Sequence, residues 1–228
     1  MGAMIDFRRP DGQTAPGYLA PASQADAPGV VMIEEWWGVD DRIKATADRL
    51  ASQGFNVLVP DLFRGRSAVT RDEASHLTEG LNFADAVTQD SIGAARYLRD
   101  HGAKRVGVLG FCIGGALAML AAMRPGFDAV STWYGFPPPE AGDPANISIP
   151  LQGHWALEDE FFSVDAVDAL ERKLDATGRK PEFYRYRAKH GFFNTGTLGQ
   201  GGLGHHDREA AETAWRHTVD FFNRTLRK

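Results

Sequence analysis

The sequence predicts one α/β domain in which a mostly parallel sheet is covered by helices on both faces. Short apolar runs, continuous rather than alternating, recur between longer segments that have a helical period. Strands that alternate with helices in this way are typical of a parallel sheet buried on both sides. The 228 residues are 43% hydrophobic and 24% charged, which suits a single globular domain with a sizeable core. No repeat, low-complexity tract or linker divides the chain, so we expect one domain over residues 4–228 without a large cap domain.

Composition also narrows the classes of partner. The formal net charge of −5 argues against nucleic acid or an anionic membrane surface. No apolar run approaches the ~20 residues of a membrane span, and the N-terminus lacks the order of a signal peptide. The single cysteine rules out an internal disulfide and a multi-cysteine metal cluster. We therefore expect a cytoplasmic monomer or homodimer with no metal and no cofactor. Residues 1–3, Met-Gly-Ala, are interpreted as a cloning scar.

The first part of the chain is expected to form an edge hairpin, two buried strands and a helix. Turn-forming Asp-Gly and Pro-Gly pairs separate the two hairpin strands, near 5–8 and 17–20, from each other and from the first buried strand. The helix begins at Asp40 or Asp41 and stops at Gly54. The buried strands on either side of it are 30–34 and 55–59. The polar stretch 64–80 has no clear period and leaves room for a short helix.

The remaining elements alternate regularly. Further strands are expected over 106–109, 129–134, 151–155 and 182–186. Further helices are expected over 84–100, from the turn after residue 110 to 123, from the cap at Ser163 to Gly178, and over 207–226. The glycine-rich segment 191–204 predicts a mobile loop.

The segment around Cys112 joins a strand directly to a helix. Its residues 110–114, G-F-C-I-G, have the nucleophile-elbow pattern with cysteine in the serine position. A turn this tight strains the central residue, so its neighbours must lack bulky side chains. The turn also places the thiol at a helix N-terminus, which favours the thiolate. The pattern indicates a reactive cysteine; the alternative is an inert, buried thiol.

Reactive side chains follow four of the predicted strands, at the sheet edge where ligands bind in such folds. Glu35 and Cys112 come directly after their strands, and Asp159 and His190 come four residues after theirs. The chain order Cys, Asp, His is that of α/β-hydrolases. In such a triad the cysteine attacks a carbonyl carbon, the histidine exchanges protons, and the aspartate orients the imidazole.

Backbone N–H groups near the thiol complete the expected site. We expect the N–H groups of Ile113 and Trp36 to hold the oxyanion. Seven aromatic residues are core candidates by type: Trp36, Trp37, Trp133, Tyr134, Trp155, Phe161 and Phe162. Six of the seven lie at or just after carboxyl ends of predicted strands, which is more than filling the core requires.

Several of these assignments have rivals in the sequence. His205 and His206 are alternative bases, and with Glu209 they form a weak metal motif. Asp143 and Asp165 are alternatives to Asp159, which also fits a solvated acidic turn. Glu35 also fits an ordinary carboxylate at the end of a strand.

The segments that carry Glu35, Cys112, Asp159 and His190 resemble those of the dienelactone hydrolase family of α/β-hydrolases, the carboxymethylenebutenolidases. The resemblance implies the α/β-hydrolase fold and a Cys112–His190–Asp159 triad that hydrolyses esters or lactones through a thioester acyl-enzyme. It also implies that Glu35 pairs with the resting thiol and swings away when substrate arrives. The matching stretches run in order over nearly the whole chain: 35–38 (EWWG), 59–63 (VPDLF), 110–116 (GFCIGGA), 133–135 (WYG), 158–161 (EDEF) and 188–192 (AKHGF).

The chain departs from the family at the groups that bind substrate. Type members of the family hold a substrate carboxylate with two arginines. This chain has Asn194 at one position, and at the other the best match lies near His76, with Arg71 close by. An amide cannot replace a bidentate guanidinium. An uncharged ester or lactone is therefore at least as well supported as the dienelactone. The residues expected to contact it are Trp37, Tyr134, Phe161, Asn194 and His76.

Three other functions stay open at the level of sequence. The same triad suits another electrophile, such as a thioester or an activated phosphate ester. Cys112 also suits a redox-sensing thiol without turnover. Nucleotide binding by the glycine-rich turn is the weakest, because the spacing is neither G-x-G-x-x-G nor a P-loop.

Overall fold

A computed structural model describes residues 2–227 and contains one eight-stranded sheet in the order β1-β2-β4-β3-β5-β6-β7-β8. The pairs β1–β2 and β2–β4 are antiparallel, and every other neighbouring pair is parallel. The sheet thus has the mostly parallel architecture predicted from the sequence. Its strands are β1 (Ala3–Arg8), β2 (Thr14–Ala20), β3 (Gly29–Ile33), β4 (Asn56–Pro60), β5 (Val106–Phe111), β6 (Ala129–Trp133), β7 (Leu151–Glu158) and β8 (Glu182–Lys189).

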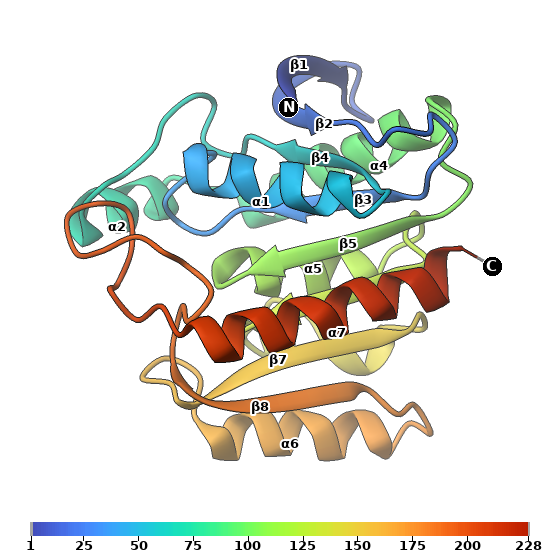
Figure 1. Cartoon of the computed structure of the whole chain (residues 1–228). Helices are drawn as coiled ribbons and strands as arrows, with labels where there is room; N and C mark the ends of the chain where they lie inside the picture. The colour runs from blue at the N-terminus through green and yellow to red at the C-terminus, as the bar shows by residue number, and fades with distance from the viewer. Residues whose placement is uncertain (1, 228) are drawn as a thin grey trace.

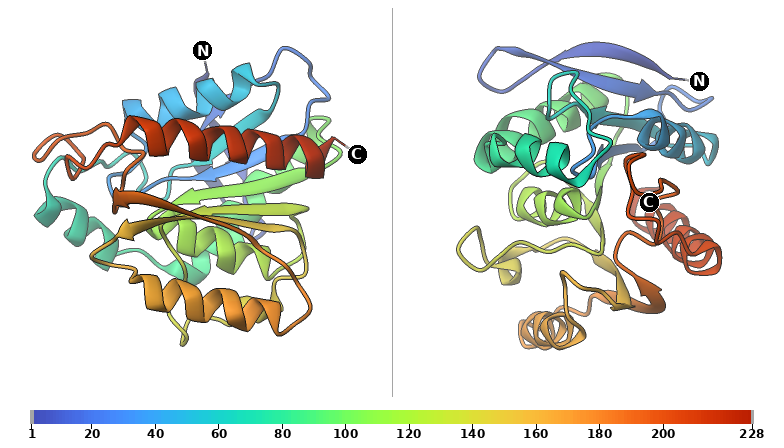
Figure 2. Two further views of the ribbon diagram at one scale, coloured as in Figure 1. Left: turned by 60° about the horizontal axis from the view of Figure 1, so that its bottom comes forward. Right: turned by 90° about the vertical axis from the view of Figure 1, so that its left-hand side faces the viewer.

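Helices cover both faces of the sheet (Figure 1 and Figure 2). Because side chains alternate along a strand, β3 supplies Val31 and Ile33 to one core and Val30 and Met32 to the other. The first core lies under α4 (Ile92–Asp100), α5 (Ile113–Ala122) and α6 (Val164–Asp175). The second lies under α1 (Asp41–Ser52) and α7 (Arg208–Leu226). The layering predicted from the sequence is confirmed.

Local capping sets where several helices begin. The Asp40 side chain accepts hydrogen bonds from two N–H groups of α1, and Ser163 accepts one from α6, as the sequence predicted. The polar stretch 64–80 holds a regular helix, α2 (Arg71–Glu79), which begins with a capping box between Thr70 and Glu73.

The helix expected over 84–100 is not continuous. It consists of α3 (Phe83–Asp85), a π-helical turn η1 (Ala86–Ser91) and α4. In this turn the buried Asp90 accepts hydrogen bonds from Arg64 and Arg9. A short 3₁₀ turn, η2 (Pro144–Asn146), lies in the proline-rich loop before β7.

The strands β7 and β8 both run three residues further than the apolar runs predicted. Their pairing continues past a bulge to Glu158 and Lys189. Backbone pairing extends both strands to their last residues, Glu158 and Lys189, which are polar and exposed and therefore give no apolar signal. Asp159 and His190 therefore follow their strands directly.

The loop 191–204 packs against the neighbouring segments (Figure 1). The Gly201 N–H donates to the Val69 carbonyl at 3.0 Å, and Arg42 donates to the Gln200 carbonyl. Leu203 joins a small apolar cluster with Trp37 and residues of the α2 region. The loop expected to be mobile is thus tied to α1 and to the approach to α2.

The backbone is tightly packed at the turn between β5 and α5. Cys112 has φ 54° and ψ −121°, a region that a non-glycine residue rarely adopts. A Cβ atom on Gly110 would lie 1.9 Å from the Gly114 carbonyl oxygen, and one on Gly114 would lie 2.4 Å from that of Glu34. A Cβ atom on Gly135 would lie 1.9 Å from the carbonyl oxygen of Cys112 itself. Glycine at these positions is what allows the strained turn.

Glu34 is a buried acid next to this turn. One carboxyl oxygen accepts from the Leu62 N–H at 2.9 Å, and within residues 2–227 the other has no hydrogen-bond partner. Burial raises the pKa of Glu34 well above its ordinary 4.5, hydrogen bonds from backbone N–H groups oppose this, and Asp61 and Asp90 add to it. Above pH 4.5 the folded protein therefore binds the Glu34 proton more tightly than the unfolded chain does.

Substitution of Gly135 by Ala is expected to lower the free energy of unfolding by about 3 kcal/mol, because the new methyl group collides with the Cys112 carbonyl. Urea denaturation measures the change. The control is Gly80→Ala, whose Cβ atom would lie 3.7 Å from the nearest atom, so it should cost nothing or stabilise slightly. Equal stability of the two variants would contradict the packing argument.

Glu34→Gln tests the buried acid. Above pH 4.5 the unfolded wild type binds fewer protons than the folded protein, so its stability falls as pH rises. Relative to wild type, the variant should gain up to about 1.4 kcal/mol per pH unit above that value. Chemical denaturation from pH 5 to pH 8 gives the slope. The exposed Glu140→Gln is the control, and a slope equal to that of the control would show that Glu34 ionises normally.

Candidate active site

Three side chains from separate strand ends meet at the carboxyl edge of the sheet. The Nε2 atom of His190 lies 3.2 Å from the Sγ atom of Cys112. The Nδ1 atom of His190 donates to Asp159, at 2.9 Å to Oδ2 and 3.1 Å to Oδ1. The side chains of His190 and Asp159 are only 3% and 2% exposed, whereas Cys112 is half-buried. Hydrogen bonds thus connect Cys112, His190 and Asp159 in one line.

The surroundings of His190 favour its charged form. Burial by itself lowers the pKa of His190, but the contacts with Cys112 and Asp159 outweigh burial and raise it to about 10. Asp159 is itself fixed, because its Oδ1 atom accepts from the N–H groups of Phe161 and Phe162 at 2.8 and 2.9 Å. The raised pKa keeps the imidazole protonated at neutral pH.

Aromatic rings enclose the imidazole. The centroids of the Phe161, Tyr134 and Phe162 rings lie 4.7, 5.1 and 5.8 Å from that of His190. Phe161 is 51% exposed, so it marks the open side of the site, whereas Tyr134 is fully buried. Water is excluded from most of the His190 ring.

Glu35 is close to the site but is bound elsewhere. Its Oε1 atom accepts from the Tyr134 hydroxyl at 3.0 Å, and its Oε2 atom accepts from the Asn194 amide. Burial raises its pKa, while the Asn194 hydrogen bond and the charge on His190 oppose the shift. In this structure the hydrogen-bond partner of the thiol is His190 and not Glu35.

The two backbone groups expected to hold an oxyanion are available. Within residues 2–227 neither the N–H of Ile113 nor that of Trp36 has a hydrogen-bond acceptor. Ile113 begins α5, so its N–H also carries the positive end of the helix dipole. Trp36 lines the same small space as Cys112 and His190.

The other expected site residues divide into two groups. Trp37 and Asn194 line the space around the thiol. His76 does not reach it: its side chain is 86% exposed on α2 and lies 4.0 Å from Glu79. The nearby Arg71 lies 3.8 Å from Glu160, in the loop that carries Asp159.

The rivals proposed from sequence lie in other environments. The Nδ1 atom of His205 contacts the His190 carbonyl at 3.0 Å, and His206 lines a different pocket. Asp143 pairs with Lys173 at 2.8 Å, and Asp165 lies in the first turn of α6. Within residues 2–227 none of these side chains is hydrogen-bonded to the His190 ring or to the Cys112 thiol.

Sequence reasoning missed the apolar residues behind the thiol. Phe111 and Phe193 stack with their ring centroids 5.2 Å apart at 13°, and Leu203 lines the space beside Cys112. Phe111 and Phe193 are direct neighbours of two predicted site residues, Cys112 and Asn194. That adjacency was the available signal.

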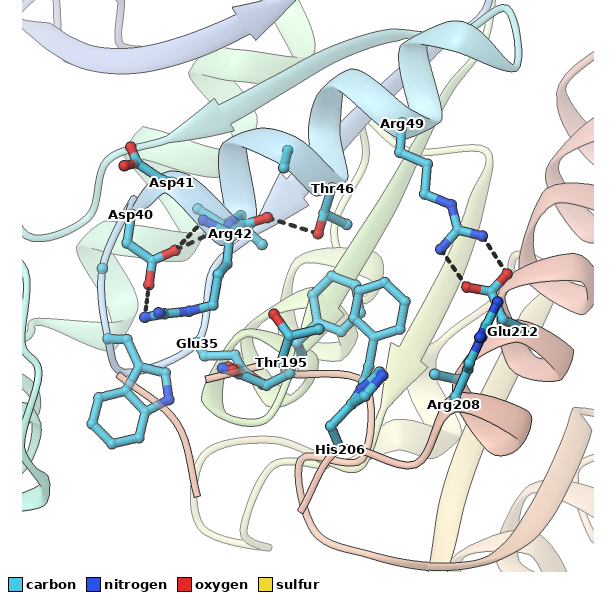
Figure 3. Close-up of a pocket in the computed structure, with 18 residues that line it drawn as sticks. Glu35, Asp40, Asp41, Arg42, Thr46, Arg49, Thr195, His206, Arg208 and Glu212 are labelled. Carbon is cyan, nitrogen blue, oxygen red and sulfur yellow. Dashed lines mark hydrogen bonds and ion pairs between the residues drawn. The ribbon is translucent and has the colours of Figure 1, made fainter. Parts of the chain in front are cut away.

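Two pockets meet at Glu35. The space beside Cys112 has a volume of about 10 Å³, which is room for at most one water molecule. The second pocket lies between α1 and α7 and has a volume of about 460 Å³ (Figure 3). Glu35, Trp37 and Asn194 line both spaces.

Two further findings concern ligands and membranes. Among the described residues no group of three or more His, Cys, Asp or Glu side chains is placed to hold a metal ion. In the same part of the chain no helix is both long and apolar enough to cross a membrane.

Comparison with known proteins identifies the family of this chain. A model of the dienelactone hydrolase family matches residues 15–226. "Protein usf" of Aquifex pyrophilus is 32% identical over 99% of this chain and 100% of its own length. The carboxymethylenebutenolidase of Rhodococcus opacus is 28% identical over 96% of this chain and 90% of its own. Among solved structures, a dienelactone hydrolase-like promiscuous phosphotriesterase from metagenomic libraries shares the fold, with a TM-score of 0.85 and 20% identity over 99% of this chain and 98% of its own. The chain belongs to the dienelactone hydrolase family of carboxylic ester hydrolases.

Proposed function

We propose that the protein hydrolyses small esters or lactones with Cys112 as nucleophile, His190 as general acid and base, and Asp159 as the residue that orients His190. The observation that carries this proposal is the contact of 3.2 Å between Cys112 Sγ and His190 Nε2, with Asp159 bound to the opposite ring nitrogen. A nucleophile within hydrogen-bond reach of a base that a third group orients is the arrangement required for acyl transfer.

The first half-reaction forms a thioester. The Cys112 thiolate attacks the carbonyl carbon, and the N–H groups of Ile113 and Trp36 stabilise the oxyanion that develops. As the new C–S bond forms and the ester C–O bond breaks, the His190 imidazolium gives its Nε2 proton to the leaving oxygen.

The second half-reaction releases the acid. Neutral His190 takes a proton from water, and the hydroxide attacks the thioester carbonyl. The C–S bond breaks, and the thiolate returns beside the imidazolium. Neither half-reaction requires a metal or a cofactor.

Glu35 has a supporting role in the proposal. Its hydrogen bonds with Tyr134 and Asn194 hold its carboxyl group at the wall of the space beside Cys112. Burial raises the pKa of this carboxyl group. A contact between Glu35 and the thiol, as the family resemblance implies, requires that the Asn194 hydrogen bond open first. Trp37, Tyr134 and Phe161 supply the apolar surroundings of the substrate.

An activated phosphate ester is the second candidate substrate. One structural neighbour of the same fold is described as a promiscuous phosphotriesterase. A thiolate held by the same triad can attack phosphorus in line with the leaving oxygen. A panel of lactones, aryl esters and phosphotriesters separates these substrates.

Reversible oxidation of Cys112 with no hydrolysis of any of these esters would favour the redox-sensing alternative. We also propose a cytoplasmic location, which cell fractionation tests. The proposed monomeric or dimeric state is tested by light scattering.

Loss of either Cys112 or His190 should abolish turnover. We expect Cys112→Ala and His190→Ala each to lower kcat/KM for p-nitrophenyl acetate at least about a thousandfold, since the triad acts as a unit. The control His101→Ala, on the exposed end of α4, should match wild type. Turnover that survives in both variants would exclude the triad.

The charge state of His190 can be measured directly. NMR titration of labelled histidine should place the His190 pKa near 10 in wild type and more than one unit lower in Cys112→Ser, because the neutral hydroxyl no longer stabilises the imidazolium. The pKa of His190 in the folded protein exceeds the value of 6.5 in the unfolded chain. The contribution of His190 to the stability of the fold is therefore complete below pH 6.5 and is lost as pH rises through 10. His101 serves as the internal control, and an unchanged His190 pKa in Cys112→Ser would rule out the ion pair.

A further inference from the structure

The space beside the thiol is too small for any ester. About 10 Å³ leaves room for one water molecule, whereas pockets that hold small ligands occupy ~300–1,000 Å³. The pocket of about 460 Å³ between α1 and α7 falls in that range, and it shares Glu35, Trp37 and Asn194 with the reacting space. Glu35, which is held by Asn194, therefore lies on the common wall of the two spaces.

The inner end of the large pocket is apolar. Phe111 and Ala211 are buried, and Phe193 stacks on Phe111. Phe111 directly precedes Cys112 and Phe193 directly precedes Asn194 in the chain, and both residues line this pocket. This end suits hydrocarbon better than a charged group.

The charges of the pocket are largely paired within the protein (Figure 3). Arg42 forms an ion pair with Asp40, and Arg49 forms one with Glu212 at 2.6 Å. The Arg49 guanidinium also lies 4.5 Å over the Trp215 ring. Arg208 lies on the α7 side near Glu212, away from Glu35. Two of the three arginines of the pocket are thus already paired with carboxylates, and this favours a neutral ligand over a carboxylate.

The position of the general acid, His190, determines which half of the substrate enters the pocket between α1 and α7. His190 must reach the leaving oxygen, so the alcohol part lies on its side, next to the half-exposed Phe161. The acyl part then extends away from His190, towards Glu35 and Phe111.

We propose that the pocket between α1 and α7 binds the acyl chain of a neutral ester, and that separation of Glu35 from Asn194 opens it to Cys112. The proposal rests on the proposed hydrolase function and specifies its substrate class: uncharged esters with a medium-length or aromatic acyl group. Thr46, on α1, and Ala211, on α7, face the pocket and determine how long a chain it accepts.

The test compares acyl chains with a constant leaving group. For p-nitrophenyl esters, wild type should show a kcat/KM at least tenfold higher for octanoate than for acetate. Thr46→Trp, which fills the pocket, should lower the octanoate-to-acetate ratio at least tenfold. The matched control Thr213→Trp makes the same change on α7 outside the pocket and should keep the wild-type ratio. An unchanged ratio in Thr46→Trp would overturn the proposal and leave the hydrolase function intact.

Binding without turnover separates the pocket from the chemistry. Calorimetry on Cys112→Ala should detect octanamide, with affinity lost when Thr46→Trp is added and kept when Thr213→Trp is added. Equal binding in all three proteins would also overturn the acyl pocket. Wild type that hydrolyses no ester would overturn the proposed function, even where octanamide still binds in the pocket.

Discussion

The strained backbone of Cys112 is the constraint on which the site depends. A positive φ at this residue turns the chain from β5 into α5 within one residue and leaves the thiol at the helix N-terminus. The turn exists only because Gly110, Gly114 and Gly135 let three backbone segments approach within contact distances that a Cβ atom would block. Once the thiol is fixed, the positions of its partners are set by where β7 and β8 end. Close backbone packing thus maintains the strained conformation at the residue whose sulfur atom must be held in place.

Burial then controls the charges of the site. Removal of water by itself lowers the pKa of a histidine, but it also strengthens the electrostatic interactions of the ring, and at His190 the contacts with Cys112 and Asp159 prevail. Glu34 and Glu35 show the opposite balance, because burial is the largest effect on both acids and raises their pKa.

The sequence was sufficient to predict the layering, the mostly parallel sheet and the three side chains that meet at its carboxyl edge. Those predictions rest on apolar periodicity and on the glycine pattern around Cys112, which are local signals. It was insufficient for the ends of β7 and β8, because polar residues there are held by pairing and not by burial. It was also insufficient for His76, since no local pattern states which way a residue of α2 faces. The capping box of Thr70 and Glu73 did carry a signal for α2.

The pocket between α1 and α7 could not have been predicted, because it is formed by residues distant in sequence whose side chains are ordinary for helix surfaces. Only its inner wall, next to Cys112 and Asn194, lies near a motif. Tertiary packing, and not composition, makes this surface concave.

The attachment of the loop 191–204 has a consequence for local stability. Phe192 and Phe193 anchor the start of the loop in the core. The part after Asn194 is held by a few hydrogen bonds, such as those from Gly201 to Val69 and from Arg42 to Gln200, and by one buried apolar side chain, Leu203. Segments with so few buried contacts open at a lower free energy than the sheet beneath them. Asn194 lies at the start of this part, and its amide also donates to the Gly201 carbonyl at 3.3 Å. We therefore expect local opening around Gly201 to weaken the contact of Asn194 with Glu35, and hydrogen exchange of the Gly201 amide measures the free energy of that opening.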